Sequence, residues 1–211
     1  MRRSRQHNTR FNVGFAIQVT VLVLLGCVLD GVAQTQKVEV TLDPGQTKID
    51  ISVHDVHGGV HGSFKLKSGS VTFNPKTGEA YGAIIVDAQS GDTGNSSRDH
   101  KMNKDVLESQ RYPDIVFTPK RVIGTVDKEG KSNVQVQGVF RIHGADHDLT
   151  LTVSVEVSAG RLAATTSFVV PYESLGMKNP SILFLRVDGK AEVSVSAVGK
   201  MTFANSGHEA H

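Results

Sequence analysis

The sequence has no tryptophan, and its 211 residues include a single cysteine, Cys27. One cysteine cannot form an internal disulfide, so a folded domain made from this chain has to rely on its hydrophobic core. An excess of charge of one sign is missing as well, since 23 basic residues stand against 21 acidic ones. Part of the small basic excess lies within the first ten residues. The remainder is close to neutral, and we therefore do not expect a nucleic-acid-binding protein.

Several motifs that carry chemistry are also missing. The sequence has no G-x-S-x-G nucleophile elbow, no phosphate-binding G-x-x-x-x-G-K loop and no dinucleotide fingerprint. These absences exclude the commonest hydrolase and nucleotide-dependent classes. We expect a protein that is not an enzyme, with no catalytic residues and no cofactor.

The N-terminus has three parts that are typical of a secretory signal peptide. A basic stretch ends at Arg10, an apolar run covers residues 13–29, and the small residues Gly31, Val32 and Ala33 resemble a cleavage site. We predict that residues 1–33 are a signal peptide. The mature protein is then periplasmic or secreted.

Two alternatives to simple cleavage stay open. Residues 24–27 (Leu-Leu-Gly-Cys) resemble a lipobox, in which case the protein is a lipoprotein anchored at Cys27. A retained membrane anchor is the third option, because the apolar run is near the lower limit of length for crossing a bilayer.

From Lys37 onwards, apolar residues recur at every second position, which is the period of a strand with one buried face. Residues 149–157 and 191–197 show this period most clearly, and turn-forming clusters such as residues 74–78 separate the runs. Short strands without interleaved helices indicate an all-β sandwich or barrel. We assign residues 37–201 to one domain and predict that residues 205–211 form a disordered tail.

One segment, residues 96–109, breaks the alternation. Met102, Val106 and Leu107 are at helical spacing, and Ser96 followed by Asp99 resembles a capping box that starts a helix. We predict one helix of about three turns, inserted between two strands and lying over an opening of the barrel.

The residues around this helix resemble the signature of the YceI-like family. The segments in register with that signature are Asp92-Thr93-Gly94-Asn95, Arg98-Asp99, Lys101-Met102, Val106-Leu107-Glu108, and Tyr112-Pro113 with Ile115 and Phe117. Residues 60–64 and 142–144 also agree, and the resemblance extends over about residues 38–199.

The resemblance implies an extended lipocalin-like fold, an eight-stranded antiparallel barrel with one inserted helix, whose interior holds a polyisoprenoid or a quinone-like lipid. It also implies a non-enzymatic lipid carrier, of which some relatives are periplasmic. Two departures from the family pattern, residues 54–59 and 106–108, bear on the shape of the pocket mouth. The candidate ligand-binding residues are Asn95, Arg98, Met102, Val106, Phe117 and Phe140.

The residues alone leave other interpretations open. Small inward side chains leave space inside a barrel, but the same alternation also fits a filled core. A filled barrel would suit an envelope interaction module or a stress-related scaffold. Within residues 92–99, we favour roles in the turn and the helix start, with Arg98 paired to a nearby carboxylate, over catalysis. The partner that we expect is a long-chain apolar lipid, with membrane proximity and a homodimer as open options.

Five histidines permit a metal-site hypothesis, because imidazole is a common metal ligand. They are His54, His57, His61, His143 and His147. His54 falls on the other strand face from His57 and His61, and no H-E-x-x-H pattern is present. We therefore predict no metal site, and a metal-dependent enzyme is the least favoured alternative.

Overall fold

The computed structural model describes residues 36–54, 58–180 and 187–205. The predicted signal peptide, residues 1–33, lies outside this part, as do residues 206–211 of the tail predicted over 205–211. Asn205, its first residue, is instead the last residue of a strand. In the described part of the chain, no helix has both the length and the apolar character needed to cross a membrane.

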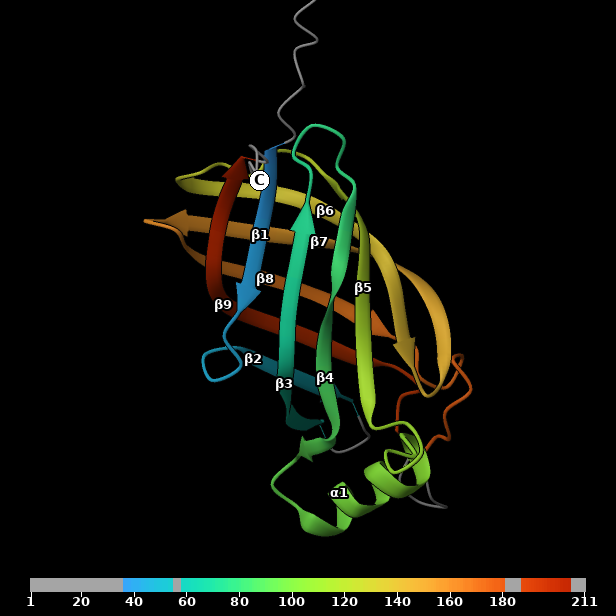
Figure 1. The fold of residues 1–211 in the computed structure, drawn as a ribbon. Helices are drawn as coiled ribbons and strands as arrows, with labels where there is room; N and C mark the ends of the chain where they lie inside the picture. Colours follow the sequence, from blue (N-terminus) through green and yellow to red (C-terminus); the bar gives the residue numbers. More distant parts are fainter. Residues whose placement is uncertain (1–35, 55–57, 181–186, 206–211) are drawn as a thin grey trace, which may run out of the picture. The chain divides into compact units, whose positions relative to one another are not determined.

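Within these described ranges, nine strands form one closed antiparallel sheet, consistent with the predicted all-β class (Figure 1). They are β1 (Gln36–Leu42), β2 (Lys48–Val53), β3 (Val60–Phe73), β4 (Ala80–Asp92), β5 (Asp114–Ile123), β6 (Gly130–Ile142), β7 (Ala145–Ser158), β8 (Arg161–Val170) and β9 (Ala191–Asn205). From β3 to β9 each strand pairs with the next one along the chain. The barrel is a meander.

β1 and β2 share one position in the barrel, because both lie between β3 and β9. Val38 of β1 is opposite Phe73 on one side and Phe203 on the other. Ile49 of β2 lies in the same way between Phe64 and Val195. The nine strands therefore occupy eight positions around the barrel, which confirms the predicted eight-stranded architecture.

Two-residue turns join the strands of the longest hairpins. His143 and Gly144 connect β6 to β7 with φ angles of 51° and 78°, and Ala159 and Gly160 connect β7 to β8 with 49° and 75°. Turns with two positive φ angles match the right-handed twist of paired strands. They fix the register in which alternate side chains of β6, β7 and β8 face the interior.

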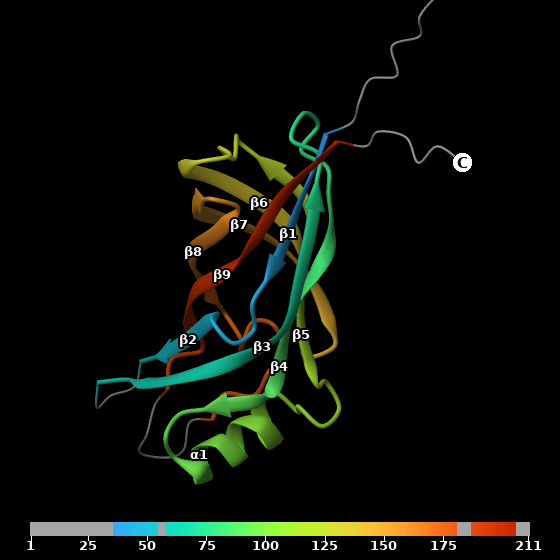
Figure 2. The ribbon, with the colours of Figure 1, turned by 60° about the vertical axis from the view of Figure 1, so that its left-hand side comes forward.

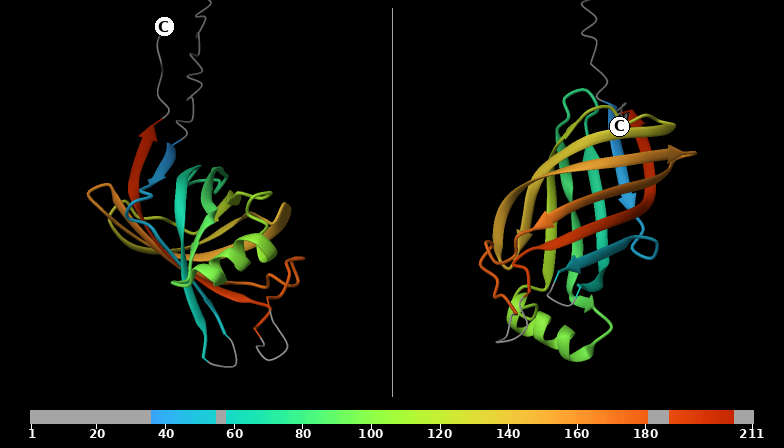
Figure 3. Two further views of the ribbon diagram at one scale, coloured as in Figure 1. Left: turned by 90° about the horizontal axis from the view of Figure 1, so that it is seen from below. Right: turned by 180° about the vertical axis from the view of Figure 1, so that it is seen from behind.

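The inserted helix covers one end of the barrel. It consists of α1 (Ser96–Lys101) followed by a π-helical segment, η1 (Met102–Val106). In Figures 1 and 2, α1 lies at the opposite end from the start of β1, and the left view of Figure 3 shows it crossing that end. This agrees with the predicted helix over an opening of the barrel.

The predicted cap of this helix is wrong by one residue. Asn95 is the N-cap, with extended backbone and a side-chain oxygen that accepts from the Arg98 N–H at 3.0 Å. Asp99 does not bond back to the helix start as in a capping box. It accepts instead from the backbone and side chain of Thr93, at 2.9 and 2.6 Å.

Candidate functional site

The barrel encloses a cavity of about 650 Å³. All nine strands, the helix and residues 171–180 contribute to its lining, which is almost wholly apolar. Its volume lies within the range of cavities that bind small molecules in proteins. The cavity is therefore the candidate functional site.

The cavity exists because many inward-facing positions hold small side chains. Ala164 of β8 and Ala197 of β9 face each other across the sheet register, and Val155 flanks Ala164 on β7. All three line the cavity. Side chains of this size do not meet in the middle of an eight-stranded barrel, so room for one ligand is left.

Larger aromatic residues shape the half of the cavity nearer the helix. The Phe140 and Phe168 rings meet edge to face, with their centroids 6.1 Å apart. Phe117 lies next to Phe140 in the register of β5 and β6. A Cβ atom at Gly138 would approach the Phe117 ring to 2.8 Å, so this glycine makes room for the ring. All three phenylalanines line the cavity.

The structure brings together five of the six candidate ligand-binding residues. Arg98, Met102, Val106, Phe117 and Phe140 all line the cavity. Asn95 is not among the lining residues, because its side chain caps α1. Contact between these residues and a ligand stays a prediction.

Four polar lining residues gather beside α1, apart from Thr165 and Thr166 on β8. Thr93, Ser97, Arg98 and Lys101 all belong to this turn and helix. Arg98 donates from Nε to the Thr93 hydroxyl and from Nη2 to the Thr93 carbonyl oxygen, both at 2.8 Å. The predicted pairing of Arg98 with a carboxylate is therefore wrong, since the guanidinium is bonded to Thr93 instead. We refer to Thr93, Ser97, Arg98 and Lys101 as the polar mouth.

The polar mouth is connected to the segment that follows β8. The Lys101 ammonium donates to the Pro180 carbonyl oxygen at 3.1 Å, which joins residues 79 positions apart. In the same segment, the Tyr172 hydroxyl donates to the Asp188 carbonyl oxygen. Burial, together with the nearby Glu173 and Asp188, raises the pKa of Tyr172 to about 12. This hydroxyl consequently remains a donor at neutral pH.

His54, His61, His143 and His147, the described members of the five, are not among the residues that line the cavity. His143 is in the β6–β7 turn, with Nε2 3.3 Å from Glu108 Oε1 and its ring against that of Tyr112. His57 lies outside the described residues. Where the chain is described, no three His, Cys, Asp or Glu side chains come close enough to hold a metal ion together.

Several lining residues were missed by the analysis of the sequence. Lys101 belongs to the family signature but was not predicted as a site residue, and neither were Phe64, Phe168 and Met177. Phe64 left one signal, since it lies at the same alternate positions along β3 as Val60 and Leu66, which also line the cavity. Met177 left none, because it lies outside the strands, where no period marks an inward position.

Comparisons with known proteins agree on the family and the fold. Residues 40–202 match the model of the YceI-like domain. The crystal structure of BcnA from Burkholderia cenocepacia is similar with a TM-score of 0.61 and 17% identity, over 74% of this chain and 98% of that one. A polyisoprenoid binding domain from Saccharophagus degradans, implicated in plant cell wall breakdown, has a TM-score of 0.60 and 14% identity, over 80% and 99% of the two chains. At these identities the structural likeness concerns the fold alone. No curated protein sequence matches the chain.

Proposed function

The chain belongs to the YceI-like domain family, and from this we propose that its barrel binds and carries a long apolar lipid, a polyisoprenoid or a quinone-like molecule, without catalysing a reaction. The lipid tail occupies the cavity, and its head lies at the polar mouth. The bound lipid is the only small-molecule partner in this proposal.

The observation that carries the proposal is the apolar cavity of about 650 Å³. Each methylene that moves from water into such a cavity contributes about 0.8 kcal/mol. Ten buried methylenes would contribute about 8 kcal/mol, which is the free energy of a micromolar dissociation constant before the costs of association are subtracted. A long tail can thus be retained without any charged anchor.

Two further points support the proposal. The Saccharophagus degradans domain, which shares the fold, is a polyisoprenoid binding domain. The scaffold alternative requires a filled barrel, and an apolar cavity of this size argues against a filled interior. An empty apolar cavity is costly to a protein, whereas an occupied one is not.

The proposal includes a location outside the cytoplasm. Its support is the order of basic, apolar and small residues within positions 1–33. Cleavage after Ala33 would give a free periplasmic or secreted protein, whereas acylation of Cys27 would give a lipoprotein close to a membrane. N-terminal sequencing of the protein purified from its source distinguishes the two.

Native mass spectrometry of protein purified from its source tests the proposed function. We expect a mass above that of the polypeptide, and organic extraction should release a long-chain apolar lipid that accounts for the difference. Protein stripped in this way should take up an added long-chain isoprenoid. Repeated recovery of lipid-free protein, together with no uptake of the isoprenoid, would contradict the proposal.

A further inference from the structure

The polar mouth carries positive charge only. Among the described residues that line the cavity, Arg98 and Lys101 are the only charged ones, and none is Asp or Glu. All the other described lining residues are apolar or uncharged. A ligand in the cavity would therefore meet two cations at the helix and no opposing carboxylate from the described lining.

The helix places these cations at one side of the lining and apolar groups further along. Arg98 and Lys101 are three residues apart, which puts them on the same helix face. Arg98 is exposed, Lys101 and Met102 are half-buried, and Val106 is fully buried. All four line the cavity. Along the surface that a ligand would contact, the helix residues thus change from charged and solvent-exposed to apolar and buried.

Neither cation is in direct contact with a carboxylate of the described residues, although Asp99 bonds to the same Thr93 hydroxyl as Arg98. In the described part of the chain, Arg98 and Lys101 form no ion pair. Two cations on the barrel wall are paired instead, Arg141 with Asp146 at 2.6 Å and Lys67 with Asp114 at 2.6 Å.

Both side chains also retain donors. Arg98 uses Nε and Nη2 for Thr93, and Nη1 has no partner among the described residues. Lys101 gives one hydrogen bond, to the Pro180 carbonyl oxygen, although an ammonium has three N–H groups. These bonds hold the two side chains in place while leaving N–H groups for a ligand.

We propose that the polar mouth selects a lipid with an anionic head group, a phosphate or a carboxylate, which Arg98 and Lys101 bind while the apolar tail fills the cavity. This inference rests on the proposed function and narrows it to one class of lipid. Charge-assisted hydrogen bonds from guanidinium and ammonium groups to these anions are among the stronger polar contacts in proteins. A neutral head group gains no such contribution from the two charges.

Two pairs of probes with matched tails test the selection. One pair is geranylgeranyl phosphate and geranylgeraniol, and the other is palmitate and hexadecanol. Calorimetric titration of lipid-stripped full-chain protein should give at least tenfold tighter binding for the anionic member of a pair, at low ionic strength. The preference should shrink in 1 M salt, where the screening length falls to about 3 Å.

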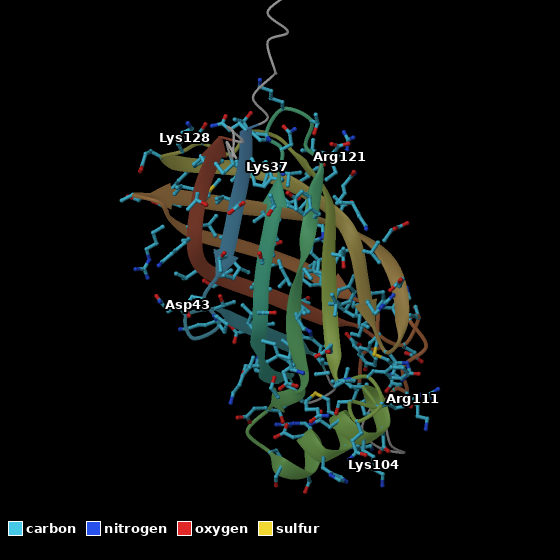
Figure 4. All side chains as sticks on the ribbon, in the orientation of Figure 1. Lys37, Asp43, Lys104, Arg111, Arg121 and Lys128 are labelled. Atoms are coloured by element: carbon cyan, nitrogen blue, oxygen red, sulfur yellow. The ribbon has the colours of Figure 1, made fainter. Side chains whose placement is uncertain are left out.

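The variants R98Q and K101Q, separately and combined, should reduce the ratio of affinities within each pair. K104Q is the matched control, because Lys104 is exposed on η1 and does not line the cavity. Figure 4 shows Lys104 at the outer side of the helix. K104Q should keep the full ratio. Thermal unfolding checks that each variant folds. If a variant does not fold, the salt dependence of the anionic preference, measured on the unaltered protein, tests the inference in its place.

The outcomes separate this inference from the proposed function. A preference for both anions, or for only one of them, supports an anionic head group and identifies its chemistry. Equal binding of the anionic and neutral members of both pairs would overturn the inference and leave lipid carriage intact. No binding of any of the four probes would instead contradict the proposed function.

Discussion

At the end of the barrel where β1 begins, the buried side chains come from the strands themselves, whereas α1 and η1 cross the other end. The buried group at the β1 end contains Val38, Val157, Leu162 and Met201, each no more than 4% exposed. We call this group the strand cluster. The helix end has a second buried group, which includes Val106, Leu107, Ile142, Tyr172 and Met177. We call it the helix cluster.

The difference between the two clusters indicates which end of the barrel is more stable and which end admits a ligand. Side chains of the strand cluster come from strands that are hydrogen-bonded to a neighbouring strand on each side. They become exposed only when the barrel unfolds. Of the five named members of the helix cluster, Val106 comes from the π-helical segment η1, and Tyr172 and Met177 come from the irregular segment after β8. Such elements open more easily than paired strands, and the polar mouth lies beside them. We expect ligand to enter at the helix end.

The same truncation at both ends gives the largest expected effect. L162A in the strand cluster should lower the free energy of unfolding by about 2–5 kcal/mol, because it enlarges the cavity where the paired strands cannot move in to fill it. L107A in the helix cluster should cost less, roughly 1–2 kcal/mol, because the helix can settle into the space. Urea denaturation followed by circular dichroism measures both, and equal losses would remove the distinction between the two ends.

A second comparison tests whether the space between the ends is where lipid binds. A164F fills the cavity from β8, whereas A163F places the same side chain on the outer face of the same strand. We expect A164F to weaken the binding of geranylgeraniol at least tenfold, about 1.4 kcal/mol, and A163F to leave it unchanged. Fluorescent-probe displacement provides the measurement. Unchanged binding by A164F would place the lipid elsewhere.

The smallest expected effect concerns one hydroxyl group of the helix cluster. Y172F removes the hydrogen bond to the Asp188 carbonyl oxygen and should cost about 1 kcal/mol at neutral pH. The pKa of Tyr172 is raised to about 12 in the folded protein, above its usual value of 10. Its contribution to stability is therefore complete below pH 10 and is lost as the pH rises towards 12.

In chemical denaturation between pH 8 and 12, Y172F should accordingly lose less stability than the unaltered protein. Y81F is the matched control, because Tyr81 is 53% exposed on the outside of β4. It should follow the unaltered protein. The same alkaline loss in all three proteins would show that Tyr172 has no special part in the helix end.

Much of the barrel could be predicted from the sequence, because the alternation of apolar and polar residues in a strand shows which of its faces is buried. The alternation from Leu149 to Val157 marks the inward face of β7, and residues 143–144 and 159–160 have the turn chemistry that two-residue hairpins need. The helix over one end was also predictable from its spacing. Its cap was placed one residue late, since both Asn95 and Ser96 are residues that favour the N-cap.

The sequence by itself determined the all-β class, the alternating faces and the family, because these depend on local periods and on motifs in order along the chain. Tertiary structure alone decided that β1 and β2 share one barrel position and that Lys101 meets Pro180. It also decided how much space the small inward side chains leave. The physical reason is that a register between distant strands and the volume they enclose depend on all the strands together, and no single segment encodes either.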